Sequence, residues 1–191
     1  PVAEIVQVHC FVGRTIRGEL HRLLGNPDGS LQIAHVPAPG VAVSEPDAER
    51  RYEALVIPDI QAACDLLLPT YEATGGNDGY VSLEVAPRWA YDAPRTVEEA
   101  QRLSAAVNRR NLLIKVPGTP EGVGAFESLT TRGTNVNVTL LFSVAQTETV
   151  FNAYIRGLTA RARAGADVRH SKAVASLFLS RVDTLVDQQL A

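Results

Sequence analysis

A short apolar run around Lys115 limits most strongly how this chain can fold. Residues 111–119 have the sequence NLLIKVPGT, so one lysine lies among aliphatic residues with no acidic residue in the run. Such runs are typical of parallel strands that are buried on both faces. Lysine is rarely buried without a partner or a task. Either Lys115 extends its ammonium group to water from a strand end, or the fold keeps it as a neutral amine that attacks a carbonyl carbon and forms a Schiff base.

Strand-like and helix-like segments alternate along most of the chain. The spacing of apolar residues predicts helices at residues 47–71, 94–107, 120–133 and 143–165 and from residue 182, and strands at 80–85, 111–116, 135–142 and 174–179. This alternation is typical of parallel strands joined by crossover helices, which is an α/β fold.

Helix boundaries have clear local signals. Thr119 is expected to cap a helix with Pro120 in its first turn, and Gly133 is expected to end it. Pro58 predicts a kink or a restart of the helix at 47–71. Two capping boxes are also expected, formed by Thr96 with Glu99 and by Ser143 with Gln146.

The first 46 residues show weaker patterns. Residues 5–12 could form a strand and residues 14–24 a helix with Ile16, Leu20 and Leu23 on one face. Residues 25–46 contain several prolines and glycines, which predicts a connection that is long for a compact domain.

The length of the chain leaves two α/β architectures open. A closed (β/α)₈ barrel usually needs about 250 residues, and this chain has 191. Either the strands form an open, doubly wound sheet, or they form an incomplete barrel.

Composition excludes several classes of function. The net charge is −3 and the basic residues form no block, which argues against binding to nucleic acid or to a membrane surface. Two cysteines and four histidines show no disulfide framework and no metal-ligand spacing. No 18-residue apolar run is present and no signal peptide opens the chain, so we expect a cytoplasmic protein, and we expect no metal or cofactor. The chain starts with Pro1 instead of Met, so we expect the true N-terminus to lie elsewhere.

Polar side chains occur near the carboxyl ends of all four predicted strands. Buried parallel strands are normally apolar, and barrel enzymes place their catalytic groups at these ends. We therefore single out Glu84, Lys115, Asn137, Thr139, Ser176 and Arg181 as candidate site residues.

Most of these side chains also have an ordinary structural explanation. A carboxylate can neutralise a nearby arginine, and amide or hydroxyl groups can satisfy the local backbone. The alternatives are an ion pair of Glu84 with Arg88, backbone bonds for Asn137 and Thr139, and a surface ion pair of Arg181 with Asp183 or Asp187.

Four sequence motifs together resemble the transaldolase family. They are Asp78–Val85, Leu113–Gly122, Asn135–Ser143 and Val174–Asp183, and they occur in the family's order. The sequence is most similar to the bacterial branch, which includes fusions of transaldolase to glucose-6-phosphate isomerase. The likeness covers about residues 47–191, so we expect a partial barrel domain there and a poorly matching region at residues 1–46.

The resemblance implies a (β/α)₈ barrel of which this chain contains strands three to six with their helices. It implies the transfer of a dihydroxyacetone unit from sedoheptulose 7-phosphate to glyceraldehyde 3-phosphate in the pentose phosphate pathway, with sugar phosphates as the partners. The expected roles are Schiff-base formation by Lys115, binding of the catalytic water by Glu84 and Thr139, binding of dihydroxyacetone hydroxyls by Asn137, and phosphate binding by Ser176 and Arg181.

The sequence also departs from the family pattern. The family has an acid/base aspartate at the end of its first strand, whereas residues 5–14 contain none. Asn26-Pro27 lacks the Thr/Ser that precedes this pair in the family's second strand. The resemblance places Ala191 inside the sixth helix. We therefore expect a fragment that is aggregation-prone and inactive when it is made alone.

Two other functions remain compatible with the residues. A related Schiff-base enzyme, similar to fructose 6-phosphate aldolase, would release free dihydroxyacetone without needing an acceptor aldehyde. A fragment without its acid/base group would bind sugar phosphates without catalysis. The sequence leaves the oligomeric state open.

Overall fold

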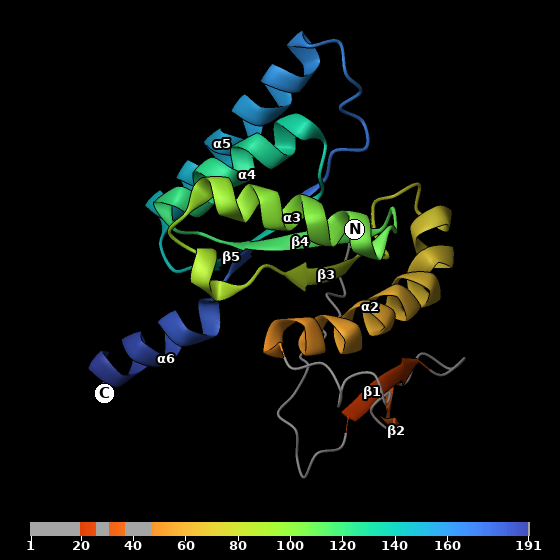
Figure 1. Ribbon diagram of the computed structural model, residues 1–191. Coiled ribbons are helices and arrows are strands. Elements are labelled where there is room, and N and C mark those ends of the chain that lie inside the picture. The colour runs from red at the N-terminus through yellow and green to blue at the C-terminus, as the bar shows by residue number, and fades with distance from the viewer. Residues whose placement is uncertain (1–19, 26–30, 37–46, 191) are drawn as a thin grey trace. The chain divides into compact units, whose positions relative to one another are not determined.

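The main sheet has the parallel α/β character that the sequence predicts. The computed structural model describes residues 20–25, 31–36 and 47–190 (Figure 1). Within these ranges the larger sheet has four strands in the order β3-β4-β5-β6. Pairing is parallel between β4 and β5 and between β5 and β6. The strands are β3 (Val81–Glu84), β4 (Leu112–Pro117), β5 (Val136–Leu141) and β6 (Ala173–Leu177).

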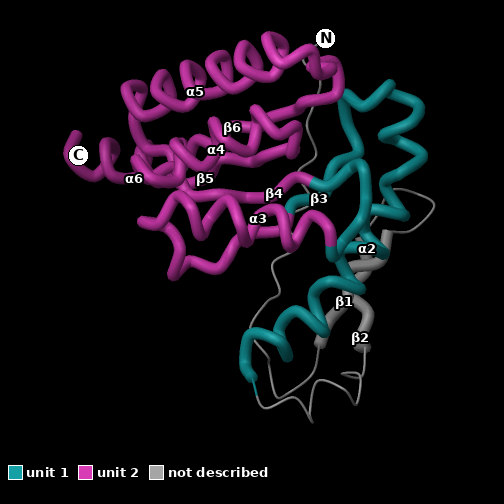
Figure 2. The backbone as a smooth tube through the Cα atoms, turned by 45° about the horizontal axis from the view of Figure 1, so that its top comes forward, with its two compact units in different colours: residues 1–82, 106–112 teal, residues 83–105, 113–191 magenta. Residues whose placement is uncertain are grey.

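The chain forms two compact units, which Figure 2 shows in different colours. Residues 1–82 with 106–112 make the first unit. Its described residues include helix α2 (Ala48–Ala73) and the antiparallel strands β1 (Leu20–Gly25) and β2 (Leu31–Val36). Residues 83–105 with 113–191 make the second unit. Its helices are η1 (Pro87–Trp89), most of α3 (Ala93–Val107), α4 (Pro120–Arg132), α5 (Val144–Arg163) and α6 (Leu179–Leu190). In the described ranges no helix combines the length and apolarity needed to cross a bilayer.

The prediction for the N-terminal region is wrong where the structure describes it. Residues 20–24, expected at the end of a helix, belong to strand β1, which pairs antiparallel with β2 from Leu20 opposite Val36 to Gly25 opposite Leu31. Strand β2 lies within the stretch expected to be a connection. Strand pairing explains the difference, because it depends on a partner outside the local window that helix periodicity samples. The strand expected at residues 5–12 lies outside the described residues.

Helix α4 confirms its predicted boundaries. The side chain of Thr119 accepts a hydrogen bond from the backbone N–H of Gly122 at 3.0 Å, and Pro120 lies in the first turn. Gly133 ends the helix with a φ of 83°, a left-handed conformation that glycine adopts without strain. Helix α2 is capped by Asp47 and continues through Pro58, so the helix does not restart there.

The predicted capping box at Thr96 is wrong. Helix α3 begins at Ala93, and Thr96 is buried within it, where its hydroxyl donates to the carbonyl of Trp89 at 2.7 Å. The first-turn bond comes from Asp92, whose carboxylate accepts from the N–H of Arg95 at 3.0 Å. A threonine followed three residues later by a glutamate fits a capping box even when the threonine lies inside the helix. The sequence could not show that the Thr96 hydroxyl bonds to Trp89 instead.

The core of the second unit lies between the strands and the pair α4–α5. Helix α4 packs against α5 and β5, and α5 packs against β5 and β6. The rings of Phe126 and Tyr154 stack at 6.1 Å between these helices. The Tyr154 hydroxyl donates to the carbonyl of Ser171 at 2.7 Å, and burial raises the pKa of Tyr154. These contacts fix β6 beside β5. Strand β5 contains the candidate site residues Asn137 and Thr139, and β6 contains Ser176.

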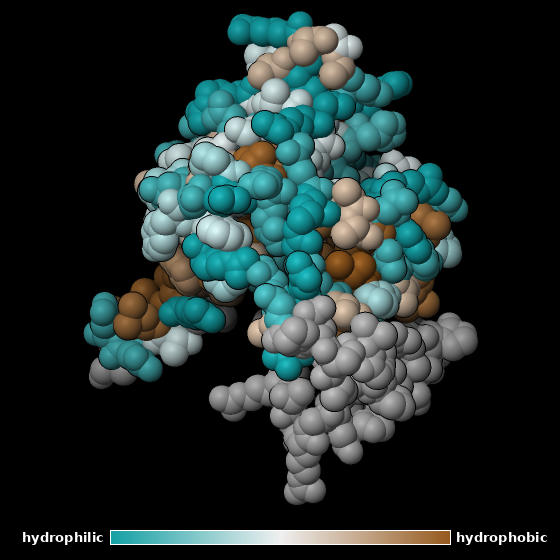
Figure 3. All heavy atoms as spheres, in the orientation of Figure 1, coloured by the Kyte–Doolittle hydropathy of each residue, from teal (hydrophilic) through white to brown (hydrophobic). Residues whose placement is uncertain are grey.

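Helix α6 presents apolar side chains at its own surface. Figure 3 shows them in brown at the lower left, where Figure 1 labels α6. The exposed apolar residues of this helix are Leu179, Leu185, Val186 and Leu190.

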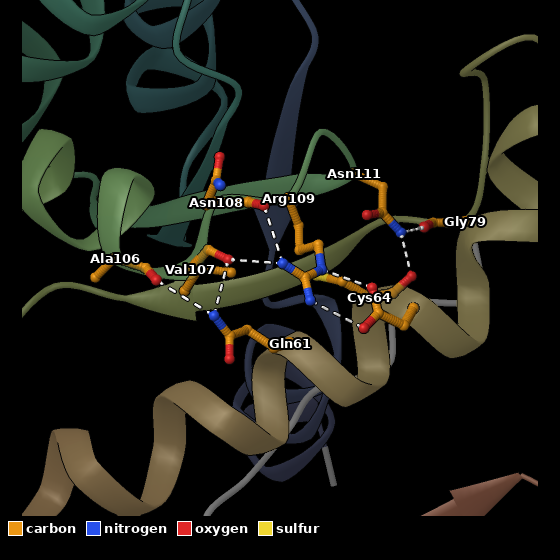
Figure 4. Close-up of polar contacts among 9 residues, drawn as sticks. Gln61, Cys64, Gly79, Ala106, Val107, Asn108, Arg109 and Asn111 are labelled. Carbon is orange, nitrogen blue, oxygen red and sulfur yellow. Dashed lines mark hydrogen bonds and ion pairs between the residues drawn. The ribbon is translucent and has the colours of Figure 1, made fainter.

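In the first unit, the start of β4 is fixed by a buried amide (Figure 4). Asn111 is completely buried, and its Nδ2 donates to the carbonyls of Cys64 at 2.8 Å and Gly79 at 2.9 Å. Nearby, Arg109 donates to both carboxylate oxygens of Asp65 at 2.6 and 3.0 Å. This guanidinium lowers the pKa of Asp65 below its usual value. Helix α2, the segment before β3 and the start of β4 are therefore joined by specific polar contacts.

We predict that Asn111→Ala destabilises the protein strongly. The change leaves two buried carbonyls without this donor, at about 1–3 kcal/mol each, so a loss of about 2–6 kcal/mol is expected. Urea denaturation followed by circular dichroism measures it. Gln61→Ala is the matched control, because its amide also donates to two carbonyls, those of Ala106 and Val107, from a less buried position. A loss at Asn111 no larger than at Gln61 contradicts the prediction.

Candidate active site

The carboxyl ends of β4, β5 and β6 place three polar side chains next to one another. Lys115 on β4 lies opposite Asn137 on β5 in the parallel register. The hydroxyl of Ser176 on β6 donates to Oδ1 of Asn137 at 2.9 Å. The side chains thus form a row across three neighbouring strands, and the hydroxyl bond fixes the orientation of the Asn137 amide.

A carboxylate from β3 completes the row at Lys115. The Nζ of Lys115 lies 3.5 Å from Oε2 of Glu84, with the lysine side chain 16% exposed and the glutamate side chain 49% exposed. Backbone pairing supports this neighbourhood, because the N–H of Val85 donates to the carbonyl of Lys115 at 3.1 Å. The sequence run around Lys115 contains no acidic residue, so its charged neighbour comes from the adjacent strand. The lysine is mostly buried and has a partner.

Arg88 takes part in a different contact from the ion pair weighed for Glu84. Its guanidinium carbon lies 4.7 Å from the centre of the Trp89 ring, in a cation–π arrangement. In the described part of the chain, Glu84 forms its ion pair with Lys115.

Thr139 lies on β5 two residues after Asn137, beyond the row formed by Lys115, Asn137 and Ser176. It pairs with Pro117 in the register with β4, and its residue is only 2% exposed. Its carbonyl accepts the N–H of Gly118 at 2.8 Å. Pro117 is two positions after Lys115, and Thr139 is two positions after Asn137, so all four positions follow the same alternation on their strands.

Arg181 lies in the first turn of α6, just after β6. Its guanidinium carbon is 5.1 Å from the centre of the Phe178 ring. Within residues 47–190, no ion pair joins Arg181 to Asp183 or Asp187. The surface ion pair considered from the sequence is therefore absent from this arrangement, and the exposed guanidinium faces solvent from the turn after β6.

The structure thus brings four of the six candidates into direct contact or register, places a fifth one step along β5, and leaves the sixth at the start of the next helix. In that order they are Glu84, Lys115, Asn137 and Ser176, then Thr139, then Arg181. The chemical role of each remains a prediction. An amine beside a carboxylate, with amide and hydroxyl groups in line, can bind a polar carbonyl compound and move protons at it.

Sequence reasoning missed one residue that joins two strand ends. Gln146 was expected only in a capping box with Ser143. The hydroxyl of Ser143 does cap α5, accepting from the N–H of Gln146 at 3.2 Å. The Gln146 side chain, however, accepts from Phe142 N–H at 3.0 Å and donates to Gly118 at 2.7 Å. Its spacing from Ser143 drew attention to the residue but predicted the wrong bond.

Comparison with known proteins identifies the family. A family model described as transaldolase/fructose-6-phosphate aldolase matches residues 29–191. The chain belongs to the transaldolase/fructose-6-phosphate aldolase family. The match starts before the region for which the sequence motifs indicated a resemblance, and it includes strand β2.

Bacterial transaldolases are similar to about three quarters of the chain. The transaldolase of Thiobacillus denitrificans is 71% identical over 147 residues, which are 77% of this chain and 41% of that protein. That of Neisseria gonorrhoeae is 51% identical over 142 residues, covering 74% of this chain and 40% of the relative. The transaldolase of Trichodesmium erythraeum is 52% identical over 136 residues, covering 71% and 36%. The chain therefore spans about 40% of the length of these relatives.

Proposed function

We propose that the protein transfers a dihydroxyacetone unit between sugar phosphates through a Schiff base on Lys115. The donor is sedoheptulose 7-phosphate, the acceptor is glyceraldehyde 3-phosphate, and the products are erythrose 4-phosphate and fructose 6-phosphate. The observation that supports this best is the mostly buried amine of Lys115 at 3.5 Å from the Glu84 carboxylate. A nucleophilic amine needs a nearby group that can accept or return a proton, and this carboxylate is placed to do so.

The proposed reaction uses Lys115 as a covalent carrier. Its nitrogen adds to the ketose carbonyl carbon, and loss of water gives an imine. Cleavage of the bond between C3 and C4 releases the aldose and leaves a three-carbon enamine on the lysine. Addition to the acceptor aldehyde and hydrolysis of the imine then regenerate the amine. In this scheme Glu84 and Thr139 hold the water that moves protons, and Asn137 binds the hydroxyls of the three-carbon unit.

Phosphate binding is proposed for Ser176 and Arg181. The planar guanidinium of arginine matches the geometry of a phosphate group, and its exposed position after β6 leaves it accessible to one. Ser176 is already bonded to Asn137, so in this proposal it would connect the phosphate end of the site to the hydroxyl-binding end.

The fold that we propose for the chain is part of a (β/α)₈ barrel, namely strands three to six with their helices. In support, the four strands follow one another in both sequence and space, with a helix after each. In that barrel the aspartate expected at the end of the first strand would accept the proton during carbon–carbon cleavage. Residues 5–14 contain no aspartate, so we assign that step to no residue of this chain.

We predict that borohydride with fructose 6-phosphate labels Lys115 in the full-length protein. Borohydride reduces the imine to a stable secondary amine, which peptide mass spectrometry locates. The chain contains a single other lysine, Lys172, just before β6, so Lys172→Ala is a matched control. Lys115→Ala should abolish the label on these residues, and Lys172→Ala should retain it. Labelling of Lys172 instead would refute the assignment, and no labelling at all would favour a sugar-phosphate-binding protein.

Product analysis separates the two enzyme activities named in the family description. With fructose 6-phosphate alone, a transaldolase should release almost no free dihydroxyacetone, because the enamine waits for an acceptor. Adding erythrose 4-phosphate should then produce sedoheptulose 7-phosphate. Chromatography of both reactions measures these products. Steady release of dihydroxyacetone without the acceptor would instead indicate a fructose 6-phosphate aldolase.

Arg181→Ala should raise KM for phosphorylated sugars far more than for dihydroxyacetone. Loss of a charge-assisted bond of roughly 1.5–3 kcal/mol predicts an increase of about 10- to 100-fold. Arg169→Ala is a suitable control, because Arg169 is exposed and bonds to Asp167 two residues away. Steady-state kinetics with both kinds of substrate measure the effect. An equal change for dihydroxyacetone would argue against a phosphate role.

A further inference from the structure

The side chain of Gln146 bonds to the segments that leave two neighbouring strands. Its Nε2 donates to the carbonyl of Gly118, after β4, at 2.7 Å and to that of Leu140, near the end of β5, at 3.2 Å. Its Oε1 accepts from the N–H of Phe142, just after β5, at 3.0 Å. One half-buried amide on α5 therefore fixes the carboxyl ends of both β4 and β5.

The β5 segment that Gln146 holds is strained. Leu140 has a φ of 64°, in the left-handed region that a leucine rarely adopts. The pairing with β6 shifts here, because Val138 lies opposite Ala175 while Leu141 lies opposite Leu177. Two residues of β5, Thr139 and Leu140, therefore face one residue of β6, which is a β-bulge. Bulges redirect neighbouring side chains and are frequent beside active sites.

Gly118 closes the connection between the two strands. Its N–H donates to the carbonyl of Thr139 at 2.8 Å. A Cβ at this position would lie 2.5 Å from Cδ2 of Leu141 and 3.0 Å from Nε2 of Gln146. A side chain at this position would therefore force Leu141 to shift and would crowd Gln146. The contacts run in a ring from Thr139 to Gly118, from Gly118 to Gln146, and from Gln146 back to Leu140.

We propose that Gln146 is a positioning residue that holds the bulge at Leu140 and so sets Thr139 against the strand of Lys115. It acts through Leu140 and Gly118 and touches no substrate. Helix capping does not explain the arrangement, because Ser143 already caps α5, and the Gln146 side chain bonds to Phe142 N–H instead of the Ser143 N–H of a capping box. The proposal rests on the proposed function, in which Thr139 holds the catalytic water.

Kinetics of Gln146→Ala in the full-length protein test the proposal. A misplacement of about 1 Å can lower a rate by about 100-fold, so we expect kcat with fructose 6-phosphate and erythrose 4-phosphate to fall by about 10- to 100-fold. KM should change less than about threefold, because the groups proposed to bind substrate remain. Ser143→Ala is the control for a weakened α5, and its kcat should stay within about twofold of the unsubstituted protein.

Leu140→Gly supplies the decisive rescue. Glycine adopts a positive φ without strain, so the bulge no longer depends on Gln146. The double variant Leu140→Gly with Gln146→Ala should regain kcat to within about fivefold of Leu140→Gly alone. A merely structural role of Gln146 predicts no such recovery, since removing the leucine side chain restores no packing. If Gln146→Ala fails to fold, the comparison uses Gln146→Glu, which keeps the acceptor for Phe142 N–H but loses the donor.

Amide hydrogen exchange provides a measurement that does not depend on turnover. Gln146→Ala should speed exchange at Phe142, which loses its acceptor, and at Gly118, and the double variant should restore protection at Gly118. Unchanged exchange at both amides, or a kcat within twofold of the unsubstituted protein, overturns the proposal. A failure of the proposed function is distinguishable, because it would abolish borohydride labelling of Lys115 in the unsubstituted protein. The exchange result would still show whether Gln146 holds the ends of β4 and β5.

Discussion

Backbone pairing between the parallel strands β4 and β5 determines where the polar groups of the proposed site lie. The register places Lys115 opposite Asn137 and Pro117 opposite Thr139, so the lysine and the amide share one level of the sheet and the threonine lies one step further on. Parallel strands present their carboxyl ends at the same edge, which is why residues far apart in sequence converge there. A shift of one residue would turn the lysine or the amide to the other face. The chemistry therefore depends first on main-chain hydrogen bonds.

The parts that the sequence predicted well have local causes. Helix α4 starts at the Thr119 cap and ends at Gly133, because both signals act within a few residues. Strand β4 was recognisable because an apolar run broken by one lysine fits a strand buried on both faces. The row of candidate residues followed from the position of each polar side chain within its own strand. The family resemblance added their proposed roles, which the pattern alone could not supply.

The parts that the sequence missed depend on partners outside the few residues over which local signals act. Residues 20–24 have helical spacing but form a strand because β2 pairs with them. Thr96 resembles a cap but lies inside a helix, where its hydroxyl reaches Trp89. Neither the ion pair between Glu84 and Lys115 nor the left-handed Leu140 has any local signature, since one needs two strands side by side and the other needs a bulge against β6. Nonlocal pairing overrides local propensity in each case.

The two ends of β4 have different roles: its start contributes to stability, and its carboxyl end bears candidate site residues. At its start Asn111 is fully buried, and its amide bonds only to backbone carbonyls, so its contribution is to stability. At its other end Lys115 is partly exposed beside a carboxylate, and Gly118 bonds to Thr139 and Gln146. In barrel enzymes the carboxyl end of a strand bears the catalytic groups, and the amino end contributes to stability. The Lys115 side chain keeps partial exposure, so complete burial does not fix it. Its geometry must come from neighbours that are themselves fixed, which is the physical reason for a strained bulge and a bonded amide just beyond the strand ends.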